Sequence, residues 1–405
     1  MGNHKACQAY GNEVKGMRIR SGFALHSAFV LAGIATTMLG PLLPGLQARW
    51  NIADGRAGLL FTAQFLASVS SAAAVGMLAR RYGYSKLIGF GLLLVAAGVA
   101  GCAVSGWPAA LPCVAVYGSG LGLIIPAGNL GIAALHPGAE SRHVMALNLS
   151  WCGGAVAAPL LVAILAGSFL WILPVAALVC AALYGAAPWP AWSGELASPV
   201  QLGRLPLLLT ALLLFLYVGA ENAIGGWVAV MTLRGSGAQS LWAILPSAFW
   251  AGMLAGRIFS RTLLARLGPS VIVISGLLVA FVAAAFLIAV HGSDWSAAAG
   301  ALSGFGLSPV FPLVVAQYAE AGATRSASGL IFSAAGLGGA ALPALVGLLS
   351  QLCGSLRAGM SAVLLCVAAM MFLQLRLARV FRHSAQGPPS IGSHPQSAAL
   401  SSQGR

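Results

Sequence analysis

The sequence has few charged residues and almost no acidic ones. Only 7% of its 405 residues are charged, and Asp and Glu together number 7, against 21 Lys and Arg. Soluble domains carry about 25% charged residues, so this composition excludes an ordinary soluble globular protein. With 59% hydrophobic residues and a mean hydropathy of +0.90, the chain is predicted to be a multi-pass membrane protein.

Cysteine motifs and catalytic clusters are also missing from the sequence. None of the 7 cysteines belongs to a CxxC pair, and most lie inside apolar runs, which argues against a disulfide framework or a zinc site. No catalytic pair is legible, so we expect no metal, no cofactor and no enzyme activity. The net charge of +14 comes from cations between apolar runs, a pattern typical of membrane topology and not of nucleic-acid binding.

Twelve apolar runs follow one another along the chain, each about as long as the 20 residues needed to cross a bilayer. They cover residues 22–47, 56–79, 84–105, 109–135, 143–166, 168–187, 205–233, 239–264, 269–291, 295–318, 326–351 and 358–381. A polar, proline-rich break divides them into two sets of six. The sequence therefore predicts an all-α membrane protein with about 12 transmembrane helices in two six-helix bundles.

The predicted domain boundaries follow from these runs. The two bundles are residues 22–187 and 205–383, joined by a cytoplasmic linker at 188–204. A cytoplasmic tail at 1–21 precedes them. A tail at 384–405, rich in Ser, Gln, Gly and Pro, follows them and is predicted to be disordered.

The positions of the cations set the expected orientation. With the N-terminus inside, all but four of the 21 Lys and Arg fall on the cytoplasmic side; the four exceptions are Arg49, Arg56, Arg234 and Arg357. Lys and Arg concentrate in cytoplasmic loops of membrane proteins. Both termini are therefore predicted to be cytoplasmic.

The two sets of runs resemble each other at a shift of about 185 residues, which indicates an internal repeat. The residues Gly118, Gly120, Leu121 and Pro126 correspond to Gly304, Gly306, Leu307 and Pro312. Transporters built from such repeats bind their substrate between the two halves, near the middle of the bilayer.

Glu221 is the one acidic residue that the apolar runs place near mid-membrane, at the centre of residues 205–233. An ionisable group at that depth costs several kcal/mol or more unless it faces a cavity or a partner. Burial favours the neutral form of a carboxyl group, so Glu221 could carry a proton. It could equally accept a hydrogen bond from a substrate hydroxyl, or serve as a structural hydrogen-bond partner.

Short motifs resemble the major facilitator superfamily. The stretch Gly76-Met-Leu-Ala-Arg-Arg-Tyr-Gly83 resembles its cytoplasmic loop motif, with Arg80 in place of the usual acid. Within that superfamily, three further stretches resemble the fucose/glucose/galactose permease group. They are Tyr217-Val-Gly-Ala220 with Trp227, Gly306-Leu-Ser-Pro-Val-Phe-Pro312, and Ala35-Thr36 leading to Leu42-Leu43-Pro44. The superfamily resemblance covers residues 22–383 and implies a sugar:proton symporter.

The chain departs from that group at its acidic positions. Fucose permeases carry acids in the first and fourth spans, where this sequence has Gly40 and Ile125, with the neighbouring Asn129 kept. Proton coupling would therefore depend on Glu221, or the protein is a uniporter. The fifth span, Trp151 to Pro159, lacks the Gly-Pro motif of drug/proton antiporters, which disfavours an exporter.

Polar and aromatic side chains in the spans are the candidate substrate-binding residues. Amides both donate and accept hydrogen bonds, and rings stack on the apolar face of a sugar; the candidates are Gln64, Asn129, Asn148, Trp151, Tyr217, Asn222, Trp227 and Phe311. Each amide could instead bridge two helices, and each ring could be a packing residue.

Four charged residues are candidates for gating or for cytoplasmic charge: Arg80, Arg81, Arg257 and Glu320. Arg257, late in the eighth span, could close a cytoplasmic gate with Glu320 or extend to the membrane interface.

These observations predict a secondary transporter of the inner membrane, acting as a monomer surrounded by lipid. Its expected substrate is a small neutral solute, a monosaccharide or polyol, moved by alternating access with proton symport. A proton-linked exporter of drug-like or amphiphilic molecules is one alternative, and a non-transporting membrane sensor on the same scaffold is another. Nucleic acid is not an expected partner.

Overall fold

A computed structural model describes residues 22–136, 139–186, 204–236, 242, 244–289, 293–320 and 325–385. The predicted tail at 1–21, residues 188–203 of the linker and residues 386–405 of the C-terminal tail lie outside this part of the chain. Within it, every regular element is a helix and no strand occurs. The all-α prediction is confirmed.

The helices follow one another in the order that the apolar runs predict. After a first helix, Gly22–Thr37, they are α2 (Leu39–Trp50), α3 (Asp54–Val104), α4 (Ala110–Leu135), α5 (Glu140–Leu165), η1 (Ala166–Ser168), α6 (Phe169–Ala186), α7 (Arg204–Ser236), α8 (Ile244–Leu263), α9 (Pro269–Ala289), α10 (Ser293–Leu307), α11 (Val310–Glu320), α12 (Arg325–Cys353) and α13 (Leu356–Ala385).

Eight helical segments are long and apolar enough to cross a membrane, or up to nine if the bent pair of Gly22–Thr37 and α2 is one span. Two of the eight, Asp54–Val104 and Arg142–Gly185, contain 51 and 44 residues, about twice the length of one crossing. The described part of the chain thus contains several membrane-spanning helices, as a multi-pass membrane protein does.

The two longest segments break where the sequence predicts loops. In α3 the break is at Gly83, whose φ of 77° and ψ of 156° suit a residue without a Cβ atom. Between α5 and α6 the break is the short 3₁₀ helix η1. Each break divides its segment into two lengths that match two of the predicted runs.

The internal repeat has a counterpart in helix packing. A Cβ added at Gly91 would lie 2.8 Å from the Gly120 carbonyl oxygen, and one added at Gly276 would lie 2.6 Å from that of Gly306. These two pairs are related by the same shift of about 185 residues. Helices α3 and α4 therefore approach each other closely through a glycine pair, and α9 and α10 do so through the corresponding pair.

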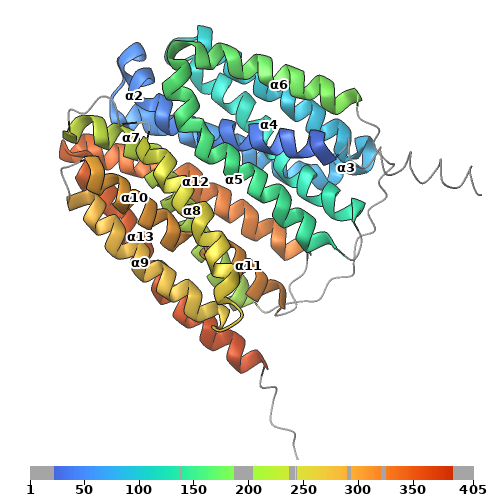
Figure 1. Ribbon diagram of the computed structural model, residues 1–405, viewed down its shortest axis with the longest axis vertical. Coiled ribbons are helices and arrows are strands. Elements are labelled where there is room, and N and C mark those ends of the chain that lie inside the picture. Colours follow the sequence, from blue (N-terminus) through green and yellow to red (C-terminus); the bar gives the residue numbers. More distant parts are fainter. Residues whose placement is uncertain are drawn as a thin grey trace, which may run out of the picture.

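Among the labelled helices, several of the first half pack against helices of the second half. Helix α3 packs against α12, α5 against α8, and α2 against α7. Figure 1 shows the blue-to-green helices on one side of the molecule and the yellow-to-red helices on the other, with α5 beside α8. At the α2–α7 contact, Gly40 lies against the backbone of Gly225 and Gly226, so the side chain of an acid could not occupy this position without separating the helices.

Candidate functional site

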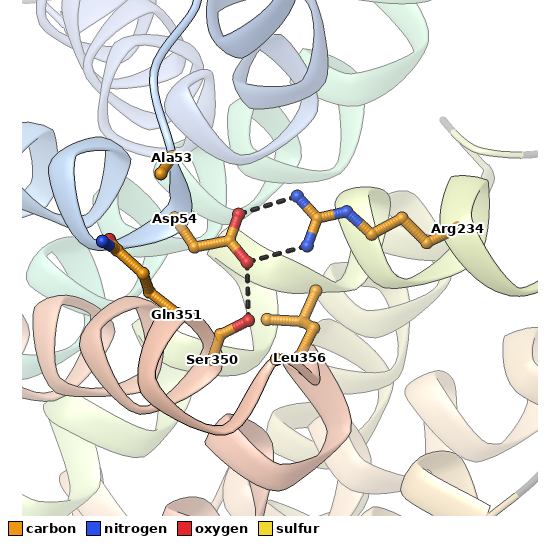
Figure 2. Close-up of a pocket in the computed structure, with 7 residues that line it drawn as sticks. Ala53, Asp54, Arg234, Ser350, Gln351 and Leu356 are labelled. Carbon is orange, nitrogen blue, oxygen red and sulfur yellow. Dashed lines mark hydrogen bonds and ion pairs between the residues drawn. The ribbon is translucent and has the colours of Figure 1, made fainter.

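Asp54, at the start of α3, is bound by four hydrogen-bond donors. Arg234 Nη1 and Nη2 donate to its two carboxylate oxygens at 2.7 Å each, and Gln47 Nε2 donates at 2.7 Å. Ser350 Oγ donates at 2.5 Å (Figure 2). The Asp54 side chain is 8% exposed, whereas that of Arg234 is 49% exposed. We call these four residues the Asp54 latch.

The Asp54 latch joins the two halves at one end of the helices. Gln47 and Asp54 belong to α2 and α3, while Arg234 and Ser350 belong to α7 and α12. Nearby, the Gly55 N–H donates to Gln351 Oε1 at 3.2 Å. A cavity of about 260 Å³ lies here, lined by Ala53, Asp54, Arg234, Ser350, Gln351, Gly354 and Leu356. Since the carboxylate is already bound by protein donors, it acts as a clamp between the halves.

The central cluster lies between α5, α7 and α8. Glu221, in the middle of α7, is 6% exposed. Its carboxyl group interacts with the charge of Arg257 on α8 and with the hydroxyl of Tyr217 one turn away on α7. Cys152 on α5 is also within electrostatic reach of Glu221 and Arg257. A buried acid and a half-buried cation therefore lie together where the halves meet.

Arg257 connects α8 to α5 across the two halves. Its Nη1 donates to Cys152 Sγ at 2.8 Å. Its Nε is buried and has no hydrogen-bond partner. A thiol is only a weak acceptor, so the guanidinium group keeps unused donor capacity. The structure places Arg257 toward Glu221 and Cys152.

Two tryptophans extend the cluster along α5 and α8. The rings of Trp151 and Trp250 meet edge to face, with centroids 5.8 Å apart. Both indole Nε1 atoms are buried without a hydrogen-bond partner. Tryptophan N–H groups find a partner in most buried sites, so these two donors are candidates for ligand contacts.

The candidate amide side chains differ in how many hydrogen bonds they already form within the protein. Gln64 is 1% exposed, donates to the Thr36 carbonyl at 3.0 Å and accepts from Tyr117 Oη at 2.9 Å. Asn148 Nδ2 donates to Asn129 Oδ1 at 2.8 Å. Asn222 Nδ2 donates to the Val218 carbonyl of its own helix at 2.8 Å. Gln64 has the contacts of a residue that ties helices together.

The other candidate aromatics lie in packed surroundings. Trp227 is fully buried, and its Nε1 donates to the Pro343 carbonyl at 2.9 Å. Tyr217 and Phe311 have ring centroids 6.0 Å apart, and Tyr217 Oη donates to Met253 Sδ at 3.7 Å. Tyr217 therefore belongs to the central cluster, whereas Trp227 packs between α7 and α12.

The remaining candidates lie away from this cluster. Arg80 and Arg81 are exposed, and the Arg81 guanidinium lies 5.3 Å from the Tyr82 ring centroid. Glu320 is the last residue of α11, and its side chain is outside the described part of the chain. Among the described residues, no group of three or more His, Cys, Asp or Glu could hold a metal ion.

Sequence reasoning missed the Asp54 latch and the role of Cys152. Asp54 and Arg234 are separated by 180 residues, and the sequence identified Arg234 only as an outer cation. Because acids are so few, an acid at the start of one span and a cation at the end of another could have indicated the pair. Cys152 has no sequence signal that distinguishes it from the other buried thiols.

The helices and the buried Glu221–Arg257 cluster together have the construction of a membrane transporter. The family model for the Major Facilitator Superfamily matches residues 25–343, and the chain belongs to this superfamily. The family points to a transporter of small molecules, not to an enzyme. No curated protein matches the chain.

Solved transporters share the fold at low sequence identity. A bacterial homolog of the human lysosomal transporter Spinster, inward-facing and unoccupied, has a TM-score of 0.75 and 14% identity, covering 91% of this chain and 98% of that one. The D-xylose–proton symporter has 0.72 and 12%, covering 89% and 97%. FucP in the outward conformation, known from E. coli as a fucose:proton symporter, has 0.63 and 18%, covering 88% and 98%.

Proposed function

We propose that the protein is a secondary transporter that carries a monosaccharide or polyol across the inner membrane by proton symport. The observation that carries this proposal is the burial of Glu221 beside Arg257 where the two halves meet. Ionisable residues inside membrane helices mark ion and substrate pathways. Glu221 is the group that takes up and releases the proton.

The proposed topology has 12 crossings, two bundles at residues 22–187 and 205–383, and both termini in the cytoplasm. The breaks at Gly83 and at Ala166–Ser168 support two crossings in each of the two longest segments. Helix α8 supplies a further crossing, although Arg257 and Arg261 make it less apolar than the candidate spans. The protein acts as a monomer.

Alternating access requires one end of the site to close while the other opens. In the proposed topology the Asp54 latch lies on the outer side, where its hydrogen bonds hold α3 against α7 and α12. The hydrogen bonds of Asp54 to Arg234 and Ser350 support a conformation closed at this end. Transport then alternates between making and breaking the Asp54 latch.

Substrate contacts come from side chains around the central cluster. The Trp151 ring, half-buried on α5, stacks on the apolar face of the solute. Asn148, one turn before Trp151, and Asn222, beside Glu221, present amide groups for hydroxyl groups. Tyr217 and Phe311 form the aromatic wall next to them.

The test is the pH change that solutes evoke in a lightly buffered suspension of de-energised cells producing the protein. A panel of monosaccharides, sugar acids and polyols is added one at a time. Alkalinisation of the medium by one of them, absent from cells without the protein, is the expected result. Silence across the whole panel would contradict the proposed symport.

A further inference from the structure

Unpartnered hydrogen-bond donors gather where α5, α7 and α8 meet. Three nitrogen atoms are buried without a hydrogen-bond partner: Arg257 Nε, Trp151 Nε1 and Trp250 Nε1. Only 3% of Trp250 is exposed. All three atoms are N–H groups, which donate and cannot accept. A buried donor without an acceptor is destabilising, so the cluster favours a ligand rich in oxygen acceptors.

The contacts between α7 and α8 show which residues of the two helices lie at the same level. Tyr217, Glu221 and Gly225 follow at intervals of one turn on α7. A Cβ on Gly225 would lie 3.0 Å from the Trp250 ring, and Tyr217 Oη contacts Met253. Trp250 and Arg257 are seven residues apart on α8, which is about 10 Å along the helix axis. An elongated solute would contact both residues.

The charge of the cluster changes when Glu221 takes up a proton. Arginine stays charged inside proteins, so Arg257 is balanced by Glu221 only while Glu221 is ionised. The other ionisable neighbours of Glu221 are Tyr217 and Cys152, and the Asp54 carboxylate is engaged in the Asp54 latch. Proton loading therefore leaves a half-buried cation that lacks a counter-charge, which is costly inside a membrane protein.

A neutral sugar supplies no counter-charge, whereas a carboxylate does. With the anion bound, Arg257 pairs with the carboxylate while Glu221 holds the proton. After both leave, the ionised Glu221 again balances the charge of Arg257. Each state of the cycle is then free of net charge.

We propose that the transported solute is a sugar acid, a six-carbon hydroxylated monocarboxylate, whose carboxylate binds Arg257 while its hydroxyl oxygens accept from Trp151 and Trp250. One proton on Glu221 accompanies each anion. The inference rests on the proposed proton symport and narrows its solute to the acids derived from monosaccharides.

The test uses the purified full-length protein in proteoliposomes, with D-glucuronate and D-gluconate as probes and D-glucose as the neutral counterpart of glucuronate. External pH and transmembrane current are recorded together. We expect both acids to alkalinise the external medium without a current, because one proton and one anion carry no net charge. Glucose is expected to evoke neither response.

Two other outcomes separate this proposal from the proposed function. If a neutral sugar alkalinises the medium with an inward current while both acids are silent, the sugar-acid proposal is overturned and proton symport stands. If acids and neutral sugars are all silent, both proposals fall. A current accompanying the acids would overturn the one-to-one stoichiometry and with it the charge argument.

Arg257→Gln tests the residue assigned to the carboxylate. Its expected effect is a fall of about 10- to 100-fold in glucuronate affinity, the range for hydrogen bonds to charged groups. The matched control is Arg261→Gln, one turn further along α8, where the exposed Arg261 donates to Met145 Sδ at 3.6 Å. We expect the control to transport like the wild type.

A second variant separates loss of carboxylate binding from loss of the folded structure. Arg257→Lys keeps the charge but not the planar pair of donors, so partial glucuronate transport is expected. Wild-type glucuronate affinity in folded Arg257→Gln would overturn the assignment. Equal loss of transport in Arg257→Gln and Arg261→Gln would do the same, because it would show a general effect on α8.

Discussion

Two acidic residues, Asp54 and Glu221, lie in opposite surroundings. Asp54 accepts hydrogen bonds from an arginine, a glutamine and a serine, and such contacts favour the ionised carboxylate. Glu221 is as deeply buried but shares its space with one hydroxyl group and the charge of Arg257. Asp54 is therefore suited to a fixed structural charge, and Glu221 to a charge that changes during transport.

At the same scale, Trp227→Phe separates packing from substrate binding. The substitution removes the hydrogen bond from Nε1 to the Pro343 carbonyl and reduces the buried volume. We expect it to lower the free energy of unfolding by at least about 1 kcal/mol, measured as a lower melting temperature in detergent. Transport per folded molecule should be retained; a loss of transport at an unchanged melting temperature would make Trp227 a binding residue.

At the scale of helices, close approach depends on individual glycines. Gly154 on α5 lies against the backbone of Val30, whereas a Cβ at the neighbouring Gly153 would meet nothing within 4 Å. The first helix and α5 therefore pack backbone to backbone along the Gly154 side. This packing sets the position of Trp151 and Cys152 in the central cluster.

The adjacent glycines provide a matched pair of variants. Gly154→Ala should destabilise the protein by about 1–3 kcal/mol, because the added methyl group overpacks the contact with the first helix. Gly153→Ala should be neutral or stabilising by up to about 1 kcal/mol, since alanine favours the helical state. Thermal unfolding of the two variants in detergent measures the difference, and equal melting temperatures would contradict the described packing.

The elements were predictable from the sequence to the extent that they depend on hydrophobicity. The breaks at Gly83 and near Ala166 coincide with the ends of apolar runs, and Glu221 was recognisable because an acid is costly within such a run. Contacts between distant segments were not predictable in this way. The pairing of Asp54 with Arg234, and of Arg257 with Cys152, depends on how α3, α5, α7 and α8 are arranged, which local periodicity does not encode.

The sequence also did not distinguish side chains that bridge helices from side chains of the same type that are free to contact a solute. Gln64 and Asn222 are both amides within spans, yet Gln64 bridges Thr36 and Tyr117, while Asn222 bonds only to its own helix among the described residues. Trp151 and Trp227 differ in the same way, because only Trp227 has a hydrogen-bond acceptor. The neighbours that decide these roles come from other helices.

At the scale of the whole molecule, the Asp54 latch holds the two halves together at one end. Asp54→Asn removes the charge that pairs with Arg234, whose side chain is 49% exposed. Hydrogen bonds to charged groups contribute about 1.5–3 kcal/mol, so we expect the balance to shift by about tenfold or more toward conformations open at this end. The measurement is the distance between spin labels at the exposed residues Leu59 and Leu352.

The control for this prediction is Arg56→Gln, since Arg56 is exposed on α3 two residues from Asp54. Its distance distribution should match that of the unmodified sequence. An unchanged distribution in Asp54→Asn would contradict the role of the Asp54 latch in closing this end.

We propose that Glu221 couples solute movement to proton movement. The most direct measurement compares the unmodified protein and Glu221→Gln in proteoliposomes, with D-glucose and D-glucuronate as probes. For the probe that the unmodified protein transports, both solute counterflow and solute-evoked pH change are recorded. We expect Glu221→Gln to retain counterflow and to lose the pH change. A variant that moves solute and protons like the unmodified protein would show that Glu221 is not the coupling group.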